Sequence, residues 1–165
     1  MLKGFVIVCA SLVAAAGSGA AQPDVRVSTA SLNAPHPLND ETRNAAIRDY
    51  LQSWQSLSQA LGQNRADLLD ADFVGTARDR LASTIRNQAA LGLSTRYQDR
   101  SHDIQVLFYS PEGLSIELAD TVAYDEQVTE NGKPLTSVPE TARYIVVLTP
   151  SEVRWRVRVL QAVPD

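Results

Sequence analysis

Residues 153–160 read V-R-W-R-V-R-V-L, and this alternation decides the class of fold. Valine or tryptophan stands at every second position, and Arg154, Arg156 and Arg158 stand between them. Successive side chains of a β-strand point to opposite faces. The pattern therefore predicts a half-buried strand, with its valines and tryptophan in a core and its arginines in water.

Three interpretations fit the three arginines. The first is a solvated face, in which the arginines pair across strands with carboxylates such as Glu117 or Asp125, at ~0.2–1 kcal/mol for each pair. The second is an interface for an acidic protein partner or for a second copy of the chain, since arginine is enriched at interface hot spots. The third is a site that binds an anionic surface such as lipid headgroups.

Three more strands are predicted before this one, over residues 104–109, 114–128 and 144–148, where apolar side chains alternate or run together. Tight-turn sequences separate them, and strands joined by tight turns are antiparallel. The sequence therefore predicts a four-stranded antiparallel sheet. The turn sequences are S-P-E-G at 110–113, N-G at 131–132 and T-P-S-E at 149–152.

Two amphipathic helices precede the strands. Apolar residues recur at steps of three and four over residues 39–62 and 73–91, which is typical of a helix that buries one face. Helices followed by antiparallel strands favour an α+β layer fold. The expected helix ends are Asn39 or Asp40 and Gly62 for the first helix, and Asp72 and Gly92 for the second.

This order of elements, the long second strand and the domain size resemble the cone-shaped superfamily of nuclear transport factor 2, scytalone dehydratase and ketosteroid isomerase. The resemblance covers roughly residues 40–162 and includes no catalytic motif. It implies amino-terminal helices packed on a curved four-stranded antiparallel sheet. A cystatin-like fold, with four strands under a helical hairpin, is the alternative.

The amino terminus has the features of a secretory signal peptide over residues 1–21. Lys3 precedes an apolar run, and small residues follow it up to Ala21. Residues 22–38 are proline-, serine- and threonine-rich and are expected to form a flexible arm, so that residues 39–165 form the single domain. The expected location is secreted or periplasmic, and the alternative is an uncleaved membrane anchor.

Charge and composition exclude several classes of function. Without Lys3 the 15 basic residues become 14 against 19 acidic ones, so the net charge moves from −4 to −5 and disfavours nucleic-acid binding. The single cysteine, Cys9, lies in the apolar leader, and the histidines are His36 and His102. No phosphate-binding loop, nucleophile elbow or zinc motif is present, so neither a metal nor another cofactor is expected.

Asp120 is the most interesting single residue. Counted by twos along the second strand, it is a carboxylate on an otherwise apolar face. The resemblance implies that such an aspartate acts as a general base that abstracts a proton next to a carbonyl. The alternatives are a β-bulge near Ala119 that turns Asp120 outward, or a structural pair with an arginine such as Arg143.

Aromatic side chains are the second group of candidates. Spread over helix and strands, they line a cavity for a small apolar ligand or simply form the core. Tyr50, Trp54, Tyr97 and Tyr124 are the predicted ligand-binding residues; the remaining aromatic candidates are Tyr109, Tyr144 and Trp155.

Three functions follow as hypotheses. The first is an exported, non-catalytic binding or scaffold domain, whose partner is another protein or a second copy bound through the sheet face. The second is a small isomerase or lyase with Asp120 as the base and a tyrosine as the oxyanion donor. The third is a membrane-tethered scaffold subunit of a secretion or conjugation apparatus, which requires that the leader stays attached.

Overall fold

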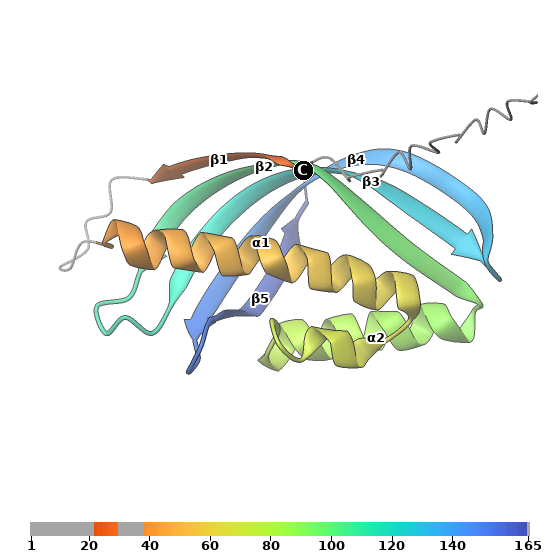
Figure 1. Ribbon diagram of the computed structural model, residues 1–165, viewed down its shortest axis with the longest axis horizontal. Helices are drawn as coiled ribbons and strands as arrows, with labels where there is room; N and C mark the ends of the chain where they lie inside the picture. The colour runs from red at the N-terminus through yellow and green to blue at the C-terminus, as the bar shows by residue number, and fades with distance from the viewer. Residues whose placement is uncertain (1–21, 30–37, 165) are drawn as a thin grey trace, which may run out of the picture.

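The computed structural model describes residues 22–29 and 38–164. Two helices cover one side of a curved sheet, which is curled but not closed (Figure 1). The expectations of an α+β class and a cone-like arrangement are confirmed. The elements are β1 (Asp24–Thr29), α1 (Asp40–Gln63), the 3-10 helix η1 (Ala66–Leu69), α2 (Gly75–Ala90), β2 (Leu93–Tyr109), β3 (Ile116–Glu130), β4 (Lys133–Pro150) and β5 (Trp155–Val163).

The sheet has five strands in the order β1-β2-β3-β4-β5, so the predicted count of four is wrong. The additional strand, β1, lies within the segment expected to be a flexible arm and pairs parallel with β2, which makes the sheet mixed. Only Val25 of β1 packs against the core, and the other described side chains of this strand are exposed. Backbone hydrogen bonds to β2 hold this strand at the edge of the sheet. Such bonds need no particular side chains, so the sequence shows almost no hydrophobic pattern here.

The first helix begins as predicted but ends later. Asn39 is the N-cap, and its side chain accepts a hydrogen bond from the Thr42 backbone N–H at 2.8 Å. Gly62 lies inside α1, and the helix ends where Asn64 takes a left-handed conformation with φ of 54°. Asparagine tolerates this region better than most residues and serves as the stop signal in place of glycine.

The second helix does not use Asp72 as its cap. Its N-cap is Val74, which makes no side-chain capping bond, and α2 begins at Gly75. The carboxylate of Asp72 instead accepts hydrogen bonds from Ser56 at 2.6 Å and from Arg154 at 2.8 Å. These bonds satisfy both oxygens of the buried carboxylate, and hydrogen bonds to a charged acceptor are stronger than those between neutral groups.

The strand of alternating arginines is shorter and less regular than predicted. It begins at Trp155, and Val153 lies before it with 83% of its surface exposed. Val157 pairs with Leu148 and Val159 pairs with Val147, so Arg158 is an extra residue that forms a bulge. A bulge shifts the alternation by one residue, which turns Val159 to the outer face and brings Leu160 against the core.

Candidate functional site

Asp120 lies in the middle of β3, where it pairs with Ile104 of β2 and Tyr144 of β4. No part of its side chain is exposed, and it points between the sheet and α1. The alternative bulge near Ala119 is absent, because β3 pairs with β4 without interruption from Ile116 to Val128. The alternative partner Arg143 is exposed and lies on the opposite face of the sheet.

Two side chains bind the same oxygen of Asp120. The Tyr50 hydroxyl donates to Oδ2 at 2.7 Å, and Nδ1 of His102 lies 2.7 Å from the same atom. Tyr50 comes from α1 and His102 from β2, so the three residues join the helix to two neighbouring strands. We call them the Tyr50–Asp120–His102 network.

His102 lies between two carboxylates. Its Nε2 is 3.7 Å from Oδ2 of Asp99, on the side opposite Asp120. Burial lowers the pKa of His102, but the hydrogen bond with Asp120 and the negative charges of Asp120 and Asp99 outweigh it and raise the pKa to about 9. The imidazole is therefore charged at neutral pH and offsets part of the negative charge in the core.

Tyr50 is held as a hydrogen-bond donor. Burial is the main cause that raises the pKa of its hydroxyl well above the ordinary value, and the charge of Asp120 adds to it. The ring is fully buried and lies edge-on to His102, with 6.3 Å between ring centroids. The hydroxyl therefore stays protonated over the whole physiological range.

Sequence reasoning considered His102 only as a zinc ligand, and its part in this network was missed. The sequence did contain a hint of this position, because His102, Ile104 and Val106 are spaced by two residues and therefore share one face of the strand. Its cross-strand partner is Val122, two residues from Asp120. The contact itself depends on the register between β2 and β3, which the sequence does not state.

The aromatic side chains pack against one another in the interior. Trp54 is 2% exposed and contacts four rings, with centroids 5.3 Å from Tyr144, 5.5 Å from His102, 6.2 Å from Tyr124 and 6.4 Å from Tyr97. Tyr97 and Tyr124 are 4.9 Å apart. The four predicted ligand-binding side chains, Tyr50, Trp54, Tyr97 and Tyr124, therefore lie in the same part of the interior. Tyr109 and Trp155 pack at the edge of the core.

Several buried polar atoms of this region have no hydrogen-bond partner. They are Nε1 of Trp54, Oδ1 of Asp99, Nε2 of His102 and Oδ1 of Asp120. Each unpaired buried polar group costs about 1–3 kcal/mol. The apolar core therefore contains a group of polar atoms whose burial is energetically unfavourable.

Asp120 lines none of three hollows on the described surface. Two lie on the outer face of the sheet, with volumes of about 250 and 300 Å³, and the third, of about 410 Å³, lies between β1 and α1. The described residues contain no group of three or more His, Cys, Asp or Glu side chains that is arranged to hold a metal ion.

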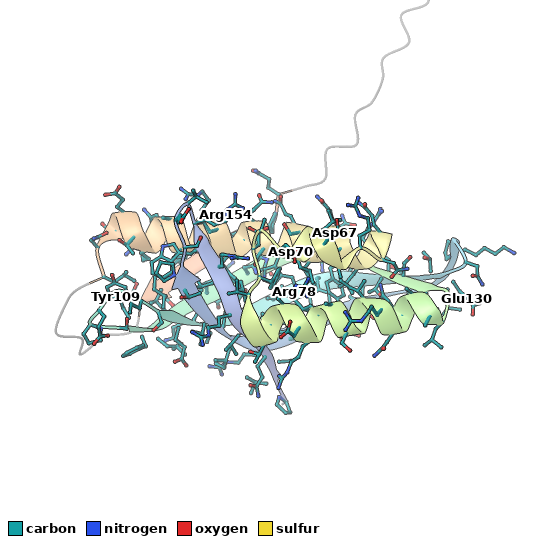
Figure 2. All side chains as sticks on the ribbon, turned by 90° about the horizontal axis from the view of Figure 1, so that it is seen from below. Asp67, Asp70, Arg78, Tyr109, Glu130 and Arg154 are labelled. Carbon is teal, nitrogen blue, oxygen red and sulfur yellow. The ribbon has the colours of Figure 1, made fainter. Side chains whose placement is uncertain are left out.

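Arg154 and Arg156 contact the loop between η1 and α2, whereas Arg158 contacts the first turn of α2. Arg154 pairs with Asp72 at 2.8 Å, and Figure 2 shows Arg154 on the helix side of the molecule, near Asp70. Arg156 donates to the backbone oxygens of Asp70 and Phe73, the second at 3.1 Å. Arg158 is exposed, and its backbone oxygen accepts from Thr76 at 3.1 Å.

The expected carboxylate partners of these arginines were wrong. Asp125 lies 3.6 Å from Arg100, and neither Asp125 nor Glu117 pairs with an arginine of β5. The cause is the bridge between Phe73 and Val157, which brings the loop onto β5 at this point. Two of the arginines therefore stabilise a loop through contacts within the chain.

Comparisons with known proteins show similarity of fold. The intermembrane space region of the chloroplast protein ARC6 has a TM-score of 0.64 at 13% identity, over 79% of this chain and 100% of that one. A scytalone dehydratase-like protein of Novosphingobium aromaticivorans has a TM-score of 0.53 at 15% identity, over 76% of this chain and 89% of that one. No family model and no curated protein sequence matches the chain. The resemblance to cone-like folds is thus confirmed for the architecture.

Proposed function

We propose that this chain is an exported, non-catalytic binding or scaffold domain. One observation carries the proposal: the carboxylate of Asp120, the best candidate for a general base, has no exposed surface and is bound by two side chains of the core. A general base must come within hydrogen-bond reach of the proton that it abstracts. Here the base is inside the protein and lines none of these three hollows; its partner His102 belongs to the lining of the hollow of about 250 Å³, but the His102 side chain itself is fully buried.

The packing of the rings supports the same function. A ligand-binding cone needs a concave pocket of several hundred Å³ lined by apolar side chains. Trp54, Tyr97, Tyr124 and Tyr144 occupy this space themselves and contact one another. The interior then serves stability, and the working surface of the domain is on the outside.

Export and membrane attachment remain part of the proposal. Residues 1–21 lie outside the described residues, and in the described part of the chain no helix is both long and apolar enough to cross a membrane. An intact-mass measurement of the protein from an exporting host separates the two forms. Loss of residues 1–21 supports a free exported domain, whereas the full mass supports a membrane-tethered scaffold subunit.

Fluorescence quenching tests whether the interior is closed. The chain has two tryptophans, so Trp155→Phe leaves Trp54 as the reporter of the interior. We expect acrylamide to quench Trp54 far less than the half-buried Trp155, which Trp54→Phe reports as the matched control. Equal quenching of the two would overturn the proposal, since Trp54 would then be open to small molecules.

A second function, proton transfer next to a carbonyl, is favoured by the Tyr50–Asp120–His102 network itself. The network places a carboxylate, a tyrosine donor and an imidazolium within 2.7 Å contacts, and Asp120 keeps one unbound oxygen. The probe is exchange of deuterium into the α-position of a cyclic enone. Exchange above the buffer rate that Asp120→Asn abolishes, in a variant that still folds, would replace the scaffold proposal with this one.

A further inference from the structure

The strand β1 lies at one edge of the sheet, and only one of its two sides is paired (Figure 1). It pairs parallel with β2, and no strand of the described residues pairs with its other side. Alternate residues of an edge strand direct their backbone N–H and C=O groups away from the sheet. This side of β1 can therefore bind a further extended chain through backbone hydrogen bonds.

The sheet has a second free edge, but prolines protect that one. The strand β5 does not extend along residues 133–142 of β4, so these residues have β3 alone as a neighbour among the described strands. Pro134 and Pro139 lie in this stretch, and proline has no N–H group to donate to a neighbouring strand. Residues 24–29 of β1 contain no proline. The edge of β1 is therefore the one that is open to an added strand along its whole length.

A groove lies beside this open edge, between β1 and α1, and has a volume of about 410 Å³. We call it the β1 groove. Ile47 is buried and Leu51 is half-buried, whereas the polar members of the lining are exposed. The groove thus has apolar side chains at its base and polar side chains at its rim. Its lining consists of Val27 from β1 and, from α1, Asn44, Ile47, Arg48, Leu51, Gln52 and Gln55.

The side chains of β1 alternate between the groove side and the outer face of the sheet. Val25 and Val27 pair with His102 and Ile104, which are buried on the helix side, so the two valines share that side. Arg26, between them, lies on the outer face. A strand added to the open edge lies about 4.8 Å beyond β1 and continues the alternation. Every second side chain of the added strand therefore enters the β1 groove.

The charge of the β1 groove favours an acidic side chain on that strand. Arg48 is the one charged side chain of the lining, and 71% of it is exposed. It donates to Asp49 through Nε at 3.2 Å and Nη2 at 3.1 Å, and these bonds leave Nη1 for a second carboxylate. The Asp49 side chain is only 12% exposed and also accepts from the backbone N–H of Trp155. A carboxylate in the groove therefore meets a cation and no acidic member of the lining.

We propose that the open edge of β1 binds an extended segment of a partner protein as an additional strand, with apolar side chains at alternate positions and a carboxylate that pairs with Arg48. This inference rests on the proposed function and names the surface and the class of partner. In such pairing the backbone hydrogen bonds supply affinity, and the pockets for alternate side chains supply specificity.

A peptide titration followed by NMR tests the proposal on the isotope-labelled protein from an exporting host. The probe is the capped peptide S-V-T-V-T-E-S. We expect saturable shifts of the backbone amide signals of β1 and no shifts in residues 133–142 of β4. The control peptide S-V-P-V-P-E-S keeps the valines and the glutamate but lacks the central N–H donors. It should bind at least about tenfold more weakly.

Matched variants on β1 locate the binding. Val27→Lys places a charge on the groove side of the strand and should abolish binding of the probe. Ser28→Lys changes the neighbouring residue, which lies on the outer face, and should leave the affinity within about twofold. The amide signals of β1 without peptide confirm that the strand stays paired with β2 in each variant.

Charge exchange tests the part of Arg48. We expect Arg48→Glu to weaken binding of the probe at least about tenfold, and the peptide S-V-T-V-T-K-S to recover binding to this variant. Arg86→Glu is the matched control, because Arg86 is an exposed arginine of α2 that does not belong to the β1 groove. Its affinity for the probe should not change.

The outcomes separate the inference from the proposed function. The inference is overturned if the wild-type protein binds the probe with a Kd above about 1 mM, if the proline peptide binds equally well, or if Val27→Lys leaves binding intact. If Trp54 still resists quenching, the proposed function survives these results. Peptide-induced shifts confined to the Trp54 indole and the rings around it overturn both, because the interior would then be the binding site.

Discussion

The Tyr50 hydroxyl of α1 donates to Oδ2 of Asp120 on β3 at 2.7 Å, across 70 residues of sequence and inside the core. This bond links the helical layer to the centre of the sheet. Its removal should destabilise the protein, because it leaves a buried carboxylate with one partner fewer.

Tyr50→Phe should lower the free energy of unfolding by about 1–3 kcal/mol, since the ring stays and only the donor is lost. Urea denaturation measures the change. Tyr97→Phe is the matched control, because the Tyr97 hydroxyl makes no hydrogen bond to the described residues, and its effect should stay within about 0.5 kcal/mol. Equal effects of the two variants would show that the bond contributes nothing.

Asp120→Asn should destabilise the protein more, by about 3–5 kcal/mol, because it leaves the charge of His102 with less compensation in the core. The effect should depend on His102. In the double variant with His102→Gln, the loss should be smaller than the sum of the single losses, which calorimetry or urea denaturation measures. Additive losses would contradict a direct coupling of the two residues.

Stability should fall with rising pH between roughly pH 6.5 and 9. The pKa of His102 is raised to about 9 when folded, against about 6.5 unfolded, so its contribution is complete below the unfolded value and is lost as the pH passes the folded value. The loss is on the order of 3 kcal/mol at most. Urea denaturation across this range measures it, and His102→Gln should flatten the curve.

An NMR titration of the His102 ring gives an independent check on that prediction. The ring signal should shift near pH 9 in the wild-type protein. If it shifts near pH 6.5 instead, the two carboxylates do not hold the charge, and the stability curve needs another cause.

Arg154→Gln should destabilise the protein by about 1–3 kcal/mol, because it removes a donor from Asp72, whose side chain is 3% exposed. Arg158→Gln, four residues further along the chain, should change stability by less than about 0.5 kcal/mol, since its side chain is exposed. Thermal denaturation of both variants measures the difference. A similar loss of stability in both variants would mean that the contact of Arg154 with Asp72 has no special effect.

The regular patterns of the sequence predicted the large elements well. The steps of three and four along α1 and the alternation along β3 follow from burial of one face, which a single segment records by itself. The strand β1 left almost no such record, because only Val25 reaches the core. The bulge at Arg158 was also invisible, because it depends on the residues opposite it on β4.

The candidate site was partly visible for the same reason. Asp120 was recognised as a candidate because it is an acidic residue on an otherwise apolar face of a strand. Its partners, however, come from α1 and β2, and the packing of helix on sheet determines them. The row of arginines suggested one common role. The tertiary structure gave Arg154 a carboxylate, Arg156 two backbone oxygens and Arg158 an exposed position.

By itself, the sequence determined the order of the two long helices and the four antiparallel strands, the main faces that they bury and the acidic charge, because each is a property of local periodicity or composition. Only the tertiary structure decided that Asp120 meets Tyr50 and His102 and that the aromatic rings fill the interior. These relationships depend on strand register and layer packing. Register and packing arise from many contacts between residues that are distant in the chain, and no single segment of the sequence records them.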